Sequence, residues 1–156
     1  MTRLLTPTLF LRMASGVMVL YAAGHAMGGV QSWSPPGETE VLQAMRAFEF
    51  DLMGATRTYM HFYLGFGVYI SALLLLQAVL VWQLASLASV DPRRARPLVA
   101  TFSLGSLIGT FVVWRFIFAV PALFSLACAA CLTIAYVLML PTAPHAAQAD
   151  SAASTS

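Results

Sequence analysis

The sequence predicts an all-α integral membrane protein built around four transmembrane helices. Hydrophobic residues make up 60% of the 156-residue chain and charged residues only 9%, whereas soluble domains typically carry about 25% charged residues. So few charges cannot cover a water-facing surface, so the apolar excess requires lipid as its solvent. Four apolar stretches, each long enough to cross about 30 Å of hydrocarbon, indicate the same architecture.

The predicted helices follow these stretches in order. Because lipid offers the backbone no hydrogen bonds, each crossing is expected to be helical. One four-helix domain is predicted over residues 1–140, with helices at about 8–30, 59–87, 97–119 and 121–140. Arg12 interrupts the first stretch, which argues against a cleaved signal peptide there. The last two helices are separated by so few residues that they must form an antiparallel hairpin.

The arginines give the predicted orientation, because the chain contains no lysine. Arg93, Arg94 and Arg96 follow the second stretch, and Arg3 and Arg12 lie near the N-terminus. The positive-inside rule places these residues and both termini in the cytoplasm, with the protein in the bacterial inner membrane. The Pro, Ala, Ser and Thr composition of residues 141–156 predicts a disordered cytoplasmic tail.

The loop between the first and second stretches contains a helical pattern. Val41, Met45, Phe48 and Leu52 recur at spacings of four, three and four residues, which places them on one face of a helix. We expect a short amphipathic helix over residues 39–53, capped by Thr39, that lies on the outer mouth of the bundle or in the membrane interface. Small residues four apart, such as Gly24 with Gly28 and Gly105 with Gly109, predict close helix packing.

Polar side chains near the outer ends of the predicted helices indicate a functional site, because polar groups are costly inside a membrane. We expect an outward-facing polar pocket, with the loop helix as its lid, that binds a lipophilic small molecule or a partner membrane protein. The candidate pocket residues are His25, Arg57, Tyr59, His61, Tyr63 and Arg115.

Other interpretations of the histidines remain open. His25 and His61, at similar predicted depths, are candidate ligands for a haem or metal ion, or proton-handling groups beside a quinone. They are also candidates for hydrogen bonds that only tie helices together. Arg115 follows Trp114 and either extends to the headgroups, anchors an anionic ligand, or pairs with Asp51 or Glu49.

Cys128 and Cys131 form a C-x-x-C pattern that a redox pair would also show. The chain holds no other cysteine to pass electrons onward, and the pair lies well inside a predicted helix, away from the cations that activate thiols. Close packing is the simpler interpretation. A formal net charge of +2 gives no reason to expect nucleic-acid binding, and the predicted crossings contain no carboxylate for proton-coupled transport.

Several segments carry a family resemblance. They are Gly24-His25-Ala26-Met27-Gly28-Gly29, Trp33-Ser34-Pro35, Met45-Arg46-Ala47-Phe48, Met53-Gly54-Ala55-Thr56-Arg57-Thr58-Tyr59 and Phe62-Tyr63-Leu64-Gly65-Phe66-Gly67. Over most of residues 12–140 the chain resembles a family of small four-helix bacterial membrane proteins, broadly similar to DoxX-like proteins in size and layout. The resemblance implies the fold and the location, and no particular activity.

The sequence therefore favours a ligand- or partner-binding membrane protein over an enzyme, and it assigns no catalytic residue or required cofactor. Two alternatives stay open, namely a haem- or quinone-linked redox subunit and a structural or assembly protein, including a homo-oligomer.

Overall fold

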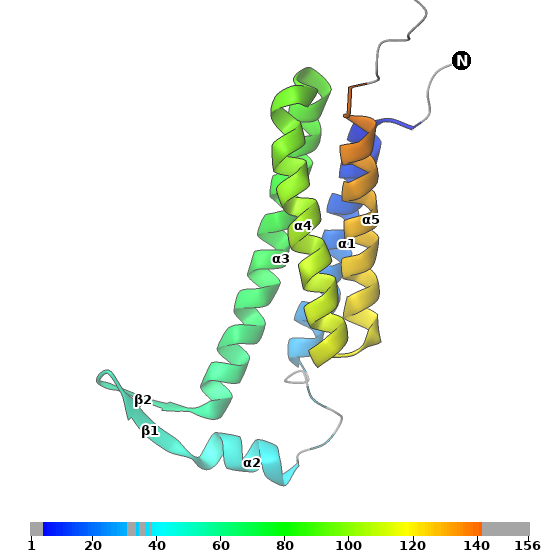
Figure 1. The fold of residues 1–156 in the computed structure, drawn as a ribbon. Coiled ribbons are helices and arrows are strands. Elements are labelled where there is room, and N and C mark those ends of the chain that lie inside the picture. Colours follow the sequence, from blue (N-terminus) through cyan, green and yellow to red (C-terminus); the bar gives the residue numbers. More distant parts are fainter. Residues whose placement is uncertain (1–4, 31–33, 35–36, 38, 142–156) are drawn as a thin grey trace, which may run out of the picture.

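Four long helices lie side by side, and a smaller unit lies across one end of them (Figure 1). The computed structural model describes residues 5–30, 34, 37 and 39–141, so the predicted tail at 142–156 lies outside the described residues. The long helices are α1 (Pro7–Val30), α3 (Tyr59–Val90), α4 (Pro92–Phe116) and α5 (Ala119–Leu138). Each of these four is long and apolar enough to cross a membrane.

The smaller unit consists of α2 (Glu40–Ala47) and a hairpin of strands β1 (Glu49–Leu52) and β2 (Ala55–Thr58). We call this end of the molecule the cap end and the opposite end, where the chain enters α1 and leaves α5, the termini end (Figure 1).

The bundle is held together mainly through α1, which packs against both α3 and α5, while α5 also packs along α4. Contact between α3 and α4 is weaker and lies near the termini end, where Asp91 joins them, and the two helices diverge toward the cap end (Figure 1). The buried residues of α4, Ala95, Val99 and Ser103, accordingly all lie in its first half.

Alanines fill much of the core. Ala14, Ala78, Ala85, Ala95 and Ala135 are completely buried, and their small side chains let the helix backbones approach closely. Hydroxyl groups add links between helices. Ser15 Oγ on α1 donates to Ala78 O on α3 at 2.7 Å, and Ser103 Oγ on α4 lies 2.7 Å from Thr133 Oγ1 on α5.

The predicted role of the glycines in this packing is wrong for three of them. A Cβ added to Gly24, Gly105 or Gly109 would meet no atom within 4 Å, apart from the neighbouring residues and nearby helix backbone. These glycines therefore do not mark close contacts within the chain, and alanine and serine occupy the close contacts instead.

The α3–α4 connection is much shorter than the sequence suggested. The predicted gap between residues 87 and 97 is helical except at Asp91. Asp91 Oδ1 accepts a hydrogen bond from Arg94 N at 3.1 Å, and Pro92 occupies the first position of α4, where its missing N–H costs little. With Asp91 as its N-cap, α4 begins five residues before Pro97.

The predicted loop helix at 39–53 is also wrong in its second half, because helix α2 ends at Ala47 and a hairpin follows. Its start is confirmed, since Thr39 Oγ1 accepts from Leu42 N at 3.3 Å. The spacing of Phe48 and Leu52 fits both a helix and a strand. The turn that follows them favours the strand. Met53 and Gly54 have φ values of 51° and 84°, which is the signature of a two-residue type I′ hairpin turn.

The turn makes a prediction about hairpin stability. Met53 is fully exposed, so replacing it loses no packing, whereas its left-handed backbone costs about 1 kcal/mol that asparagine largely avoids. Met53→Asn is expected to slow hydrogen exchange of the hairpin amides by roughly threefold to fivefold. Gly54→Val is expected to speed it. Equal exchange in both variants would contradict the turn assignment.

Candidate functional site

A cluster of aromatic rings fixes the hairpin against the start of α3. The ring of Phe50 lies 5.1 Å from Tyr59 and 5.8 Å from Phe62, measured between centroids. Phe48 stacks on Tyr59 at 5.6 Å, and Phe66 continues the series one turn after Phe62. Such contacts are each worth about 0.5–1.5 kcal/mol beyond their buried area, so the angle between hairpin and helix is well determined.

A concave site lies beside this junction, which we call the α3 groove. It has a volume of about 370 Å³ and is lined by Arg57, His61, Phe62, Gly65, Phe66 and Tyr69. Gly65 and Tyr69 each lie two residues from Gly67, about 200° around the helix. Gly67 and Ser71 are on the side of α3 that meets α1, so the groove opens on the opposite side, away from the bundle.

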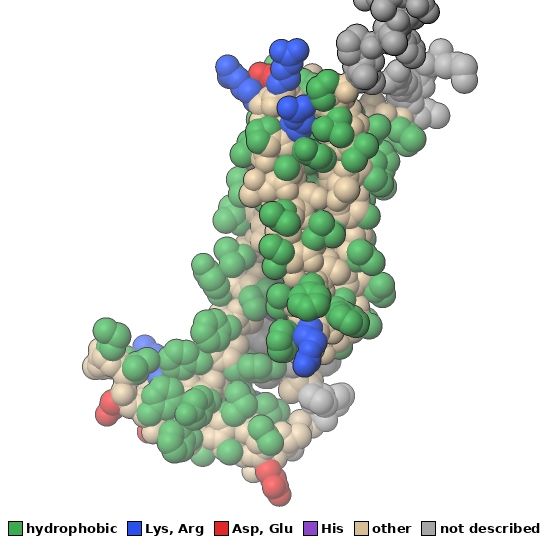
Figure 2. Space-filling view, in the orientation of Figure 1, with side chains coloured by type: hydrophobic (Ala, Val, Ile, Leu, Met, Phe, Trp, Pro, Cys, Tyr) green, Lys and Arg blue, Asp and Glu red, His purple; other side chains and the backbone are tan. Residues whose placement is uncertain are grey.

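Arg57 stands at the rim of the groove on β2, paired with Phe50 on β1. Its Nη1 donates to Thr56 O at 2.7 Å. Side chains alternate across a strand, so Glu49 and Asp51 project to the other face of the hairpin, where Asp51 Oδ1 accepts from Thr56 Oγ1 at 2.7 Å. Figure 2 shows basic atoms on the upper side of the hairpin and acidic atoms on its lower side. Within the described part of the chain, no carboxylate neutralises Arg57.

His61 is held by a capping box at the start of α3. Thr58 Oγ1 accepts from His61 N at 3.2 Å, and Thr58 N donates to His61 Nδ1 at 3.1 Å. Because Nδ1 accepts a hydrogen bond, the neutral ring carries its proton on Nε2. The capping box therefore fixes both the position of the ring and its tautomer, and it makes the Nε2–H group the donor that is left for the groove.

His25 lies in a different place, between α1 and α3. Its Nδ1 is 2.9 Å from Ser71 Oγ, and Ser71 Oγ in turn donates to Gly67 O at 3.1 Å. This hydroxyl has only one proton to donate, so the imidazole Nδ1 donates to Ser71. The contact ties α1 to α3, as the structural interpretation of this histidine predicts.

The expectation that His25 and His61 share one depth is wrong. Ser71, the partner of His25, follows His61 by ten residues, which is about 15 Å along α3. The two ligand nitrogen atoms of one metal ion lie within about 4 Å of each other. These histidines are therefore not placed to share a haem or a metal ion. The residues that the structure describes also contain no group of three His, Cys, Asp or Glu side chains suited to a metal ion.

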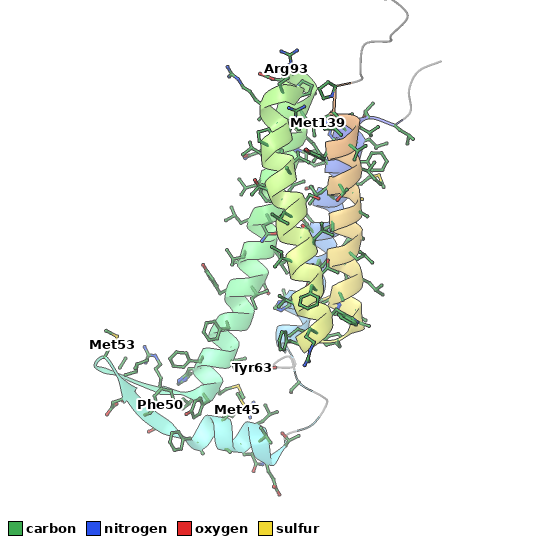
Figure 3. All side chains as sticks on the ribbon, in the orientation of Figure 1. Met45, Phe50, Met53, Tyr63, Arg93 and Met139 are labelled. Atoms are coloured by element: carbon green, nitrogen blue, oxygen red, sulfur yellow. The ribbon has the colours of Figure 1, made fainter. Side chains whose placement is uncertain are left out.

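The other predicted pocket residues are dispersed. Tyr59 belongs to the aromatic cluster and does not line the α3 groove. Tyr63 shares the face of Gly67 and points to the bundle side of α3 (Figure 3). Arg115 lies at the cap end of α4, with Cζ 5.2 Å from the Phe116 ring, and the described residues show no ion pair between it and Asp51 or Glu49. Only Arg57 and His61 of the six candidates line the groove.

Sequence reasoning missed four lining residues that carry a recognisable signal. Phe62, Phe66 and Tyr69 recur at spacings of four and three, so they form an aromatic stripe along one face of α3. Gly65 interrupts this stripe, and a Cβ placed there would meet nothing within 4 Å. A glycine in the middle of an aromatic helix face leaves a gap between the rings.

The cysteines pack between helices. Cys128 is buried, and its Sγ lies 3.9 Å from Ala14 O on α1, while Cys131 is half-buried; both are free thiols. Their positions fit the packing interpretation of the C-x-x-C pattern.

No family model matches the chain, and no curated protein or solved structure matches it either. The resemblance to DoxX-like proteins therefore stays a prediction.

The capping box predicts how His61 substitutions affect α3. His61→Ala leaves the Thr58 N–H without its partner, which costs about 1 kcal/mol and speeds hydrogen exchange in the first turn of α3 by roughly fivefold. His61→Gln is expected to restore wild-type exchange, because glutamine at this position completes a capping box with Thr58. If glutamine exchanged as fast as alanine, the box would not be what holds this turn.

Proposed function

We propose that the chain is a multi-pass protein of the bacterial inner membrane whose α3 groove binds a lipid-like amphipathic ligand. The main support for this ligand is an apolar aromatic wall on α3 with an arginine at its rim, Arg57, that makes no ion pair within the described residues. A lipid-like molecule has the same division, with an apolar chain and a polar head.

The surface of the long helices supports the membrane location. Large apolar side chains are exposed on all four, for example Leu20 at 63%, Phe66 at 63%, Leu104 at 60% and Leu123 at 64%. Hydrophobic side chains cover the visible side of the bundle, while the charged groups gather toward its two ends (Figure 2). Water does not favour such a surface, whereas lipid chains do.

The charge distribution supports the proposed orientation. Arg93, Arg94 and Arg96 lie together at the termini end. At the cap end the acidic residues Glu40, Glu49 and Asp51 offset the arginines Arg46, Arg57 and Arg115. By the positive-inside rule, the termini end then lies in the cytoplasm and the cap end lies on the outer side of the membrane.

Orientation is tested with reporters fused after residue 141. A fluorescent protein that matures only in the cytoplasm is expected to be bright, and an alkaline phosphatase that works only outside is expected to be inactive. The matched control places each reporter in the turn between Met53 and Gly54, where the two results should be reversed. Active phosphatase at the C-terminus would invert the orientation.

The position of the groove determines how a ligand reaches it. The site faces away from the other helices, so a ligand approaches from the surrounding lipid and needs no passage through the bundle. Its volume of about 370 Å³ lies in the range of small-molecule sites, about 300–1,000 Å³. Gly65 supplies the floor, where any larger side chain would occupy the space of the ligand.

An assembly role is the second candidate, and the open glycines favour it. Gly105 and Gly109 share one face of α4 and contact no close neighbour, so this face is free for another membrane helix. Under this alternative, leucine at Gly105 would disrupt a complex and leucine at Gly65 would not.

A pair of matched glycine substitutions separates these functions. A Cβ at Gly65 or at Gly105 would meet no atom within 4 Å. Gly65→Leu is expected to fill the α3 groove, and Gly105→Leu adds the same side chain to an equally open position on α4. The probe is a phospholipid with a photoreactive group in its acyl chain, cross-linked in reconstituted vesicles and mapped by mass spectrometry. Wild type and Gly105→Leu are expected to react preferentially within residues 59–70, and Gly65→Leu roughly tenfold less.

Cross-links spread evenly over all four long helices in the wild type would contradict a binding groove. Circular dichroism of both variants checks that the helices are intact.

A further inference from the structure

We infer that the α3 groove selects an anionic phospholipid, whose phosphate is held by Arg57 and His61. This rests on the proposed function, because it names the head of the ligand that the groove would bind. The inference comes from the kind of polar groups at the rim, from the way the hairpin separates charge, and from the direction in which the groove runs.

The polar groups at the rim are mainly hydrogen-bond donors. The Arg57 guanidinium offers only N–H groups, and the capping box leaves His61 with its Nε2–H as a donor. No carboxylate lines the groove. A phosphate has several acceptor oxygens and a negative charge, so it suits these donors, and arginine binds phosphate in a forked geometry. A head with only an ammonium group would meet the positive charge of Arg57.

The hairpin keeps positive and negative charge apart. Arg57 and Phe50 face the groove side, whereas Asp51 is tied to Thr56 on the opposite face. Opposite charges within about 4–6 Å would otherwise satisfy each other. Within the described residues Arg57 makes no ion pair with a carboxylate, so its positive charge stays available at the groove.

Both donors make hydrogen bonds that orient them before a ligand arrives. Arg57 donates to Thr56 O, and His61 is held by the two hydrogen bonds of the capping box. The aromatic contacts of Phe50 with Tyr59 and Phe62 hold the hairpin that carries Arg57. Less ordering is then needed on binding, and this favours affinity.

The groove also runs in the direction of a lipid in the outer leaflet. Arg57 lies two residues before Tyr59, the first residue of α3, and the apolar lining continues through Phe62 and Phe66 to Tyr69. The distance from Tyr59 to Tyr69 is about 15 Å along the helix, which is about half of the hydrocarbon core. A phosphate at Arg57 would therefore place its acyl chain along the aromatic stripe, toward the middle of the bilayer.

The test is competition against the photoreactive phospholipid by four molecules with the same acyl chains. They are phosphatidylglycerol, phosphatidylcholine, diacylglycerol and the free fatty acid. With wild-type protein, phosphatidylglycerol is expected to compete roughly tenfold better than diacylglycerol, and better than the other two. Added salt is expected to reduce this preference, because Arg57 is exposed.

Three substitutions locate the selectivity. Arg57→Gln is expected to remove the preference for phosphatidylglycerol and to leave diacylglycerol competition unchanged. Arg115→Gln makes the same change of charge at the cap end outside the groove, and is expected to behave as wild type. His61→Glu keeps the capping box with Thr58 but replaces a donor with a negative charge, so it is expected to reduce the preference without loosening α3.

The outcomes separate the inference from the proposed function. Equal competition by phosphatidylglycerol and diacylglycerol, or better competition by the fatty acid, overturns the phosphate inference. In that case Gly65→Leu would still reduce lipid cross-linking within residues 59–70, and the groove would stand. If Gly65→Leu binds every lipid as wild type does, the groove itself is wrong and the inference falls with it.

Discussion

The close packing of α1 against α3 and α5 is the interaction on which the rest of the structure depends. Alanine and serine let these backbones approach, and Ser15 reaches the carbonyl of Ala78 directly. The short connection at Asp91 brings α3 and α4 together only at the termini end. The cap half of α3 is therefore supported by α1 on one side and left open on the other, and this open side is where the groove forms.

The β1–β2 hairpin converts that open helix face into a concave site. An isolated helix is convex, so the aromatic stripe of α3 needs a second wall to become concave. The hairpin supplies it, because the type I′ turn at Met53 and Gly54 reverses the chain and the rings of Phe50 and Tyr59 pack at the corner. The capping box between Thr58 and His61 begins the helix at this corner. The turn, the aromatic contacts and the capping box together determine the position of Arg57.

The sequence predicted the parts of the molecule that depend on local composition. Four long apolar helices, the Thr39 cap and the antiparallel arrangement of the last two helices all follow from runs of apolar residues, capping residues and very short connections. The sequence does not predict the hairpin, because methionine at position 53 is not a residue that normally marks a turn. The usual signal for a type I′ turn is Asn-Gly or Asp-Gly, and Phe48 with Leu52 also fits a helical period.

The candidate site was predicted in part, and the missing part has a geometric cause. Arg57 and His61 were named because they are polar residues near a helix end. Their grouping with His25 is wrong because the outer ends of α1 and α3 do not lie at the same depth. Helix α3 has 32 residues and α1 has 24, so the first turns of α3 extend beyond the end of α1. A residue such as Tyr69 could be assigned to the groove only once the hairpin angle was known.

The chemistry of His61 also bears on whether the groove binds or catalyses. A general base must present a lone pair to its substrate. The lone pair of His61 is on Nδ1 and accepts the Thr58 N–H, so the ring is left with an N–H for the groove. Arg57 cannot act as a base because it stays protonated, and no carboxylate lines the site. Two donors beside an aromatic wall are suited to holding an anion, which favours a binding role over acid–base catalysis.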